Sequence, residues 1–336
     1  MPGRQLGEGR EVAIGQTRNL ERVSRDHFNI EPGLGPRFAQ RLDDAREVDQ
    51  ALAQRDFREQ ESVAVLLHGH VLEVGCEGPR RQGLHDLHRV FQQGDAVAHV
   101  EANTEMIAMC LTDAAAVEAV LFAEAGASAR KGLNLLDFTS MSPPQCIGIA
   151  NKLRAAGTEV YVDAPVSGGV AGATQGTLVV MCGGHAEHVT RFKPVFDAVA
   201  ARVTHMGPTG TGQTAKLCNQ HIVASSVIAM AEAIVLARRS GVEVARLPQA
   251  LEGGFADSRA FRLWGVRMAT GSWEPNVGAL DTMWKDVRNV LETMRSLGLE
   301  LPLVRAVQDI YADISAAGRG RDDLGSIASF FDDNKT

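Results

Sequence analysis

The chain lacks several features that would mark a particular class of protein. No two of its five cysteines have the Cys-x-x-Cys spacing: they are Cys76, Cys110, Cys146, Cys182 and Cys218. Such scattered thiols exclude a disulfide framework and a zinc site, and they predict a reduced, cytoplasmic protein. We find no charged-then-apolar leader and no apolar run long enough to span a bilayer.

An excess of basic residues is also missing. The formal net charge is −7, which argues against a nucleic acid or an anionic membrane as partner. The 336 residues suffice for two domains with their own cores, and 45% hydrophobic and 22% charged residues are ordinary for a globular protein.

The first part of the chain lacks the dinucleotide-binding fingerprint, a strand followed by Gly-x-Gly-x-x-Gly. In Gly33-Leu34-Gly35 the third glycine position is taken by Phe38, and Gly15 stands alone. The glycines of Gly75-Cys-Glu-Gly78 have the wrong spacing. One apolar run, residues 63–67, continues after a glycine into Val71 and Leu72, and no lysine precedes Lys131.

Two explanations for residues 1–101 remain open. The segment is either a divergent or replaced domain, or the product of a frameshift or misplaced start in a GC-rich gene. We favour the second, and the DNA upstream of codon 102 tests it. Four histidines of this segment lie close enough in the chain to suggest a metal site: His68, His70, His85 and His88. No carboxylate or cysteine spacing supports such a site, so we predict none.

Regular patterning begins near Glu105. Strand-like and helix-like segments alternate, which predicts a Rossmann-like parallel α/β domain with an atypical or disrupted N-terminal part. The predicted strands are 106–111, 133–137, 160–162, 177–181 and 202–206, and the helices are 113–121, 142–156 and 185–201. After Gly207 only helices are predicted: 212–240, 245–253, 258–270, 278–297, 302–317 and 322–333. The domains are therefore 1–101 (anomalous), 102–206 (the remaining nucleotide-binding part) and 207–336 (all-α, for substrate binding and dimerisation).

Three motifs carry the chemistry. In the first, residues 163–184, the turn Ser167-Gly168-Gly169 exposes backbone N–H groups that could cradle an anion, although an ordinary glycine loop has the same pattern. In the second, residues 207–220, Lys216 shares a helix face with Asn219 and Gln220. That face continues with apolar residues, so burial is expected to lower the pKa of Lys216 from about 10.4 toward a value useful for proton transfer. A solvated lysine is the simpler alternative. The third motif is the pair Lys285-Asp286 on a predicted helix.

Together these motifs resemble the β-hydroxyacid dehydrogenases, which include 3-hydroxyisobutyrate dehydrogenase and tartronate semialdehyde reductase (2-hydroxy-3-oxopropionate reductase), themselves similar to 6-phosphogluconate dehydrogenase. The resemblance covers residues 105–331. It implies that Lys216 is the catalytic acid/base and that the substrate is bound by Ser167, Gly168, Gly169, Asn219 and Gln220. It also implies cofactor contacts from Leu111, Thr112, Thr139, Ser140 and Lys285. This chain departs from the family at two points, with Leu111-Thr112 in place of Leu-Pro and Thr139-Ser140 in place of Ser-Thr.

The implied activity is hydride transfer between NAD or NADP and a short β-hydroxy acid or its semialdehyde. We also expect a homo-oligomer formed through the C-terminal helices, because the apolar content of helix 212–240 exceeds one face. The choice between NAD and NADP and between the two substrate types stays open. The alternative is an impaired family member that cannot bind cofactor because the fingerprint is lost. Imine reductases and a non-catalytic relative share the fold without the lysine, so Lys216 argues against both.

Overall fold

The computed structural model describes residues 63–67, 70–74, 89–90, 106–122, 132–158 and 160–333. Contacts divide the chain into Met1–Asp44 and Ala45–Thr336, and every described residue belongs to the second unit. The glycines tested for the dinucleotide fingerprint (Gly15, Gly33, Gly35, Gly75 and Gly78) lie outside the described residues.

A mixed sheet has four parallel strands at its centre. β1 (Val63–Leu67), β4 (Met106–Cys110), β5 (Asn134–Asp137) and β6 (Val160–Asp163) pair in that order, with Val63 opposite Met106, and Asp137 opposite Asp163. These runs are short and apolar, as strands covered on both faces require. The predicted parallel α/β sheet is therefore confirmed, and the apolar run at 63–67 is one of its strands.

Both margins of the sheet contain antiparallel pairs. β2 (His70–Val74) is antiparallel to β1 and to β3 (Arg89–Val90). On the other side β8 (Leu178–Gly183) is antiparallel to β6 and to β7 (Val166–Ser167), and parallel to β9 (Ala200–Gly207). Between β7 and β8 lies a short helix, α5 (Gly169–Thr174), where the sequence predicted only a glycine turn.

Helices cover both faces of the sheet. α3 (Ala114–Phe122) and α4 (Pro143–Ala155) pack on one face with Ile107 and Met109, while Met106 and Ala108 face the opposite core. This alternation is the period of two of a strand. Asp113 caps α3, as predicted, because its Oδ1 accepts the Ala116 N–H at 2.9 Å.

The helix predicted over 185–201 is wrong in one respect, because the structure breaks it into α6 (Ala186–Arg191) and α7 (Lys193–Val199). Pro194, the second residue of α7, has no N–H to continue the earlier helix and disfavours helical geometry in the residue before it.

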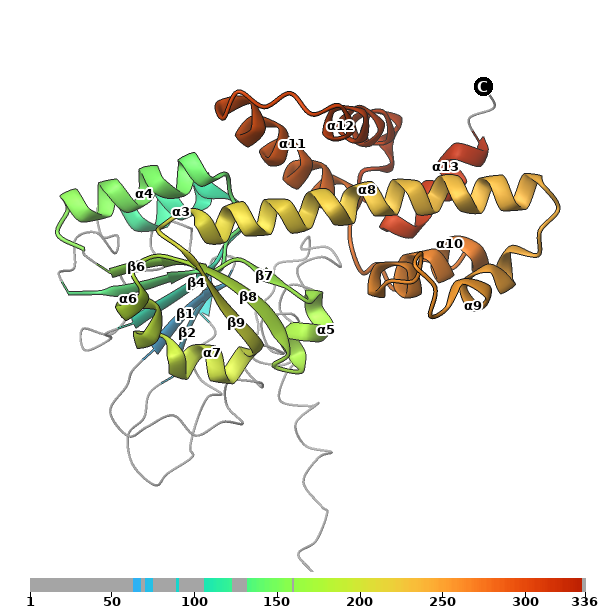
Figure 1. Cartoon of the computed structure of the whole chain (residues 1–336). Coiled ribbons are helices and arrows are strands. Elements are labelled where there is room, and N and C mark those ends of the chain that lie inside the picture. The colour runs from blue at the N-terminus through green and yellow to red at the C-terminus, as the bar shows by residue number, and fades with distance from the viewer. Residues whose placement is uncertain are drawn as a thin grey trace, which may run out of the picture. The chain divides into compact units, whose positions relative to one another are not determined.

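The second part of the described chain is helical and is organised around α8 (Thr211–Arg239), which is about 44 Å long. α11 and α12 lie on one side of α8, and α9 and α10 on the other (Figure 1). Their bounds agree closely with the predicted helices: α9 Leu247–Leu251, α10 Val266–Thr270, α11 Leu280–Ser296, α12 Pro302–Ile314 and α13 Ile327–Asp333. Short 3₁₀ or π-helical turns precede or follow several of them: Val244–Arg246, Phe261–Gly265, Ser315–Arg319 and Leu324–Ser326.

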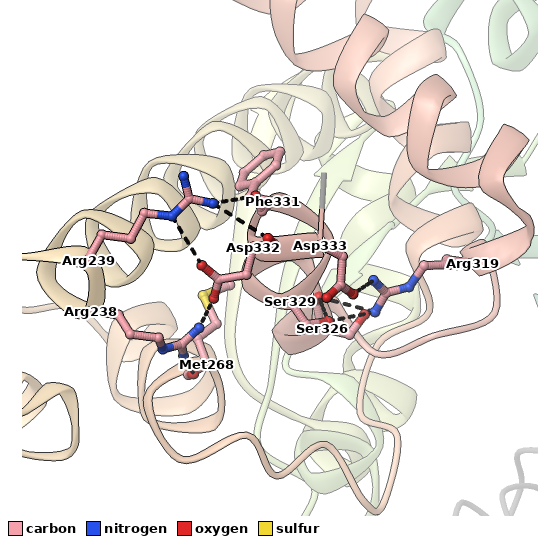
Figure 2. A network of polar contacts seen from close by, with 9 residues as sticks. All are labelled: Arg238, Arg239, Met268, Arg319, Ser326, Ser329, Phe331, Asp332 and Asp333. Atoms are coloured by element: carbon pink, nitrogen blue, oxygen red, sulfur yellow. Dashed lines mark hydrogen bonds and ion pairs between the residues drawn. The ribbon is translucent and has the colours of Figure 1, made fainter. Parts of the chain in front are cut away.

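Arginines hold the last helix in place. Figure 2 shows the Asp332 carboxylate between Arg238 and Arg239, the last residues of α8, and Arg319 reaching the Ser329 hydroxyl at 2.8 Å. Cations at the C-terminus of α8 also complement its dipole. The far end of α8 is thereby tied to α13.

By length and composition α8 could cross a bilayer, with a mean hydropathy of 1.6 in its most apolar window. The expectation that no run is long enough is therefore wrong by that criterion. The evidence for a membrane span is weak, because a core helix of a soluble protein passes the same test and 39% of the window is buried inside the protein.

Candidate active site

The N-terminus of α8 is held on the sheet by a buried carboxylate. Asp163, at the end of β6, accepts the backbone N–H of Gly210 at 2.8 Å on Oδ1 and that of Gln213 at 3.0 Å on Oδ2. These are N–H groups that a helix cannot satisfy by itself, and a negative charge complements the helix dipole there. Burial raises the pKa of Asp163, while the backbone N–H groups lower it in part.

Two glycines allow this close approach. A Cβ on Gly212 would lie 2.5 Å from the Met181 carbonyl oxygen, and a Cβ on Gly183 would lie 2.4 Å from Asp163 Oδ1. A side chain at Gly212 would push α8 away from the sheet, and one at Gly183 would displace the Asp163 carboxylate that holds α8 there.

Lys216 lies in the second turn of α8 and is half-buried. Burial lowers its pKa below the ordinary lysine value, the nearby Asp286 raises it, and the nearby Lys285 lowers it further. The predicted effect of burial is thus present in the structure. Within the described part of the chain, no hydrogen bond or ion pair engages the Lys216 ammonium.

Asp286, on α11, is a buried carboxylate that contacts both α8, through Gln220, and the adjacent residue Lys285. Its Oδ2 accepts a hydrogen bond from Gln220 Nε2 at 2.6 Å, and Gln220 Oε1 accepts one from Asn219 Nδ2 at 2.8 Å. Its Oδ1 lies 3.4 Å from Lys285 Nζ, an ion pair without hydrogen-bond geometry. Asn219 and Gln220 are therefore held beside the charged groups.

Lys285 joins the helical part to the ends of the central strands. Its Nζ donates to the Ser140 hydroxyl at 3.1 Å and to the Thr112 carbonyl at 3.3 Å. Thr112 follows β4 and Ser140 follows β5, so both lie at the carboxyl edge of parallel strands, where ligands bind in this class of sheet. The structure thus brings together three of the residues predicted to contact the cofactor.

Thr139 and Leu111 have a supporting position. The Thr139 hydroxyl accepts the Leu111 N–H at 2.9 Å, and the Thr139 N–H donates to Asp137 Oδ1 at 2.9 Å. Asp137 is fully buried, and burial raises its pKa to about 6. These bonds use the Thr139 hydroxyl to connect the two strand-end loops, which leaves Ser140 as the hydroxyl exposed to the site.

Ser167, Gly168 and Gly169 lie at the junction of β7 and α5. Gly168 has a φ of 139° and Gly169 a φ of 63°, both in the region that favours glycine. Successive N–H groups in such a turn form an anion-binding concavity. Among the described residues, no hydrogen bond connects these three to Lys216 or Lys285.

The residues present fit one end of a dinucleotide better than the other. Carbonyl, hydroxyl and ammonium groups from Thr112, Ser140 and Lys285 suit the carboxamide of a nicotinamide ring. At the pyrophosphate end a family member needs a helix directly after β1. Here the element after β1 is the antiparallel strand β2, with Leu67 opposite His70.

A cavity lies apart from this site. Its volume is about 480 Å³, it is lined by residues of α4, β9 and the turns beside them, and none of the predicted site residues lines it. Across the described ranges, no group of three or more His, Cys, Asp or Glu side chains could hold a metal ion.

Sequence reasoning missed the roles of Asp163, which it treated only as the first residue of the 163–184 motif, and of Gln213. The signal for Gln213 was its position in the second motif, between Gly212 and Lys216.

Comparisons with known proteins show the family of this chain. Residues 80–207 match the family model of the NAD binding domain of 6-phosphogluconate dehydrogenase. Residues 210–331 match the NAD-binding model of NADP-dependent 3-hydroxyisobutyrate dehydrogenase. The match begins at residue 80, upstream of Glu105, so it includes part of the segment that the sequence left unmatched.

Among curated proteins, 2-hydroxy-3-oxopropionate reductase of Escherichia coli (strain K12) is 35% identical over 261 residues, covering 77% of this chain and 88% of that protein. The crystal structure of 3-hydroxyisobutyrate dehydrogenase from Salmonella typhimurium is similar with a TM-score of 0.62 and 29% identity, over 68% of this chain and 80% of that one. The 3-hydroxyisobutyrate dehydrogenase of Mycobacterium tuberculosis with L-serine also has a TM-score of 0.62, with 27% identity over 71% and 81%. The chain therefore belongs to the β-hydroxyacid dehydrogenases, a family of NAD(P)-dependent oxidoreductases.

Proposed function

We propose that this protein transfers hydride between NAD(P) and a short β-hydroxy acid or its semialdehyde, with Lys216 as the general acid/base. The observation that carries the proposal is the half-buried Lys216, whose pKa is lowered by burial and which lies beside Asp286 and Lys285. The bound nicotinamide supplies or accepts the hydride. Lys216 donates a proton to the carbonyl oxygen during reduction and accepts one from the hydroxyl during oxidation.

The substrate is proposed to be a small carboxylate. The ammonium groups of Lys216 and Lys285 favour an anion, and the Ser167-Gly168-Gly169 turn offers N–H donors to its carboxylate. Asn219, fixed by its bond to Gln220, would orient the substrate hydroxyl or carbonyl. Relatives named for 2-hydroxy-3-oxopropionate and 3-hydroxyisobutyrate support this substrate class.

The test is turnover of tartronate semialdehyde and of 3-hydroxyisobutyrate with NADH, NADPH and their oxidised forms. Lys216→Ala should lower kcat by about 10²- to 10⁴-fold and change KM little, because a positioned proton donor contributes about that much to the rate. Arg259→Ala, which removes an exposed cation, is the matched control. Unchanged kcat in Lys216→Ala would rule out the proposed role.

The second candidate is a family member that no longer binds its cofactor. The β1–β2 hairpin favours it, because the next described element after β1 is the antiparallel strand β2, where a family member has a phosphate-binding helix. Fluorescence titration with NADH and NADPH separates the two candidates. Micromolar binding supports the dehydrogenase and shows which nucleotide is preferred, whereas no binding with either nucleotide supports the impaired form.

We further propose a cytoplasmic homo-oligomer that uses α8. Ile222 and Leu236 on this helix are 66% and 69% exposed in one protomer. A second copy packed against α8 would bury these two apolar side chains. The cysteines that the structure describes are all free thiols, as expected in a reducing compartment. Light scattering of the purified protein tests the oligomer.

A further inference from the structure

Gln213 is a buried amide that bonds at both ends to one loop. Its side chain is in the first turn of α8 and the residue is only 1% exposed. Nε2 donates to the Thr139 carbonyl at 2.7 Å, and Oε1 accepts the Met141 N–H at 3.0 Å. The two partners are the residues on either side of Ser140, so the amide fixes the backbone that carries the Ser140 hydroxyl.

The same residue is fixed on the sheet and precedes the proposed acid/base by one turn. Its backbone N–H donates to Asp163 Oδ2, and Lys216 follows at i+3 on the same helix face. On the opposite side of the site, the Ser140 hydroxyl accepts the hydrogen bond from Lys285 Nζ at 3.1 Å. A continuous set of bonds therefore runs from the first turn of α8 through the loop to Lys285.

We propose that Gln213 is a positioning residue for hydride transfer, which holds Ser140 and through it the Lys285 ammonium at a fixed distance from Lys216. The inference rests on the proposed function. The proposed reaction has no step for the Gln213 amide, and the two hydrogen bonds of its side chain are both made to the loop. Its effect comes through geometry, because small displacements of a reacting group are costly to the rate.

Gln213→Met tests this proposal, because methionine preserves the length of the side chain and removes both hydrogen bonds. We expect kcat to fall about tenfold and KM for the nucleotide to rise. In the whole protein without nucleotide, competitive acetylation of Lys216 read by mass spectrometry should show a raised pKa. The reason is that a loosened loop lets Lys285 move away and admits water, which removes both influences that lower this pKa. Gln249→Met, at an exposed glutamine, is the matched control and should behave as wild type.

A purely structural role would lower the melting temperature of Gln213→Met and leave the Lys216 pKa and the nucleotide KM unchanged, and that result overturns the proposal. If Gln213→Met does not fold, Ser140→Ala interrupts the same set of bonds without touching the buried amide. It should shift the Lys216 pKa in the same direction, and an unshifted pKa again overturns the proposal. Absence of turnover in the wild type would instead overturn the proposed function, while the acetylation result still decides whether Gln213 holds Lys285 near Lys216.

Discussion

Asp286 is the residue that opposes the lowering of the Lys216 pKa. It lies buried beside Lys285 and raises the pKa that burial and Lys285 both lower. A proton donor must stay charged until the substrate arrives, and a proton acceptor must be able to lose that charge. In the proposed reaction, the Asp286 carboxylate would balance burial and the Lys285 ammonium, and so adjust the Lys216 pKa for both directions.

Asp286→Asn should therefore move the pH profile. Reduction needs protonated Lys216, so its rate falls as pH rises through the Lys216 pKa. Removing the charge of Asp286 lowers that pKa. We therefore expect the reduction rate of the variant to begin to fall at a lower pH. The measurement is kcat/KM for semialdehyde reduction as a function of pH. Glu292→Gln, an exposed carboxylate on the same helix, should leave the profile in place. A shift toward higher pH would contradict the assignment.

The spacing of residues in the sequence could predict the candidate site residues but not their hydrogen-bond partners. The sequence placed Lys216, Asn219 and Gln220 on one helix face, because spacings of three and four residues determine a face. It could not show that Gln220 contacts Asp286 or that Lys285 reaches Ser140, residues separated by 66 and 145 positions. Contacts over such distances depend on how α11 packs against the strand-end loops.

At the scale of elements, the contact between α8 and β8 decides where the site forms. Gly212→Ala would place a methyl group 2.5 Å from the Met181 carbonyl oxygen. We expect the free energy of unfolding to fall by about 1 to 3 kcal/mol, as in other overpacked sites, and kcat to fall with it. Urea unfolding and steady-state kinetics measure the two effects.

Gly148→Ala is the matched control for this prediction. It lies inside α4 with no atom within 4 Å of an added Cβ. Alanine there should raise the free energy of unfolding by about 0.5 to 1 kcal/mol, because it restricts the unfolded chain and favours the helix. Equal effects at the two positions would refute the close-approach explanation.

Element types followed the sequence closely, and element boundaries less so. Periodicity predicted α3, α4 and the helices after Gly207, because each needs an apolar face of fixed width. The break at Phe192 and the helix α5 were missed. Pro194 was a local signal for the break that apolar periodicity did not take into account, whereas the glycine-rich segment of α5 was compatible with both a turn and a helix.

For the molecule as a whole, Asp137 makes stability depend on pH. Its pKa is about 6 in the folded protein against 3.8 for the ordinary group, because burial disfavours the charge. Between these values the folded state binds more protons than the unfolded state, so stability falls as pH rises through that window. Above it the ionised carboxylate costs about 2 to 3 kcal/mol.

Asp137→Asn should remove this cost and keep hydrogen-bonding groups toward Thr139 and Tyr161. We expect the stability of the variant relative to wild type to improve between about pH 4 and about pH 7.5, by at most the same 2 to 3 kcal/mol. Urea unfolding at several pH values measures it, with the exposed Asp309→Asn as control. A stability difference that stays constant with pH would refute the raised pKa.

The sequence by itself determined the alternation of strands and helices, the all-helical second part and the family motifs, because each depends on residues close together in the chain. Only the tertiary structure decided that Asp163 caps α8, that Gln213 holds the Ser140 loop, and that Lys285 joins β4 and β5 to the helical part. These are contacts between elements distant in sequence, and burial of charged and polar groups at such contacts is what shifts their pKa values. The apolar face of α8 predicted that burial lowers the pKa of Lys216, whereas the opposing influences of Asp286 and Lys285 depend on the packing of α11, which no local pattern contains.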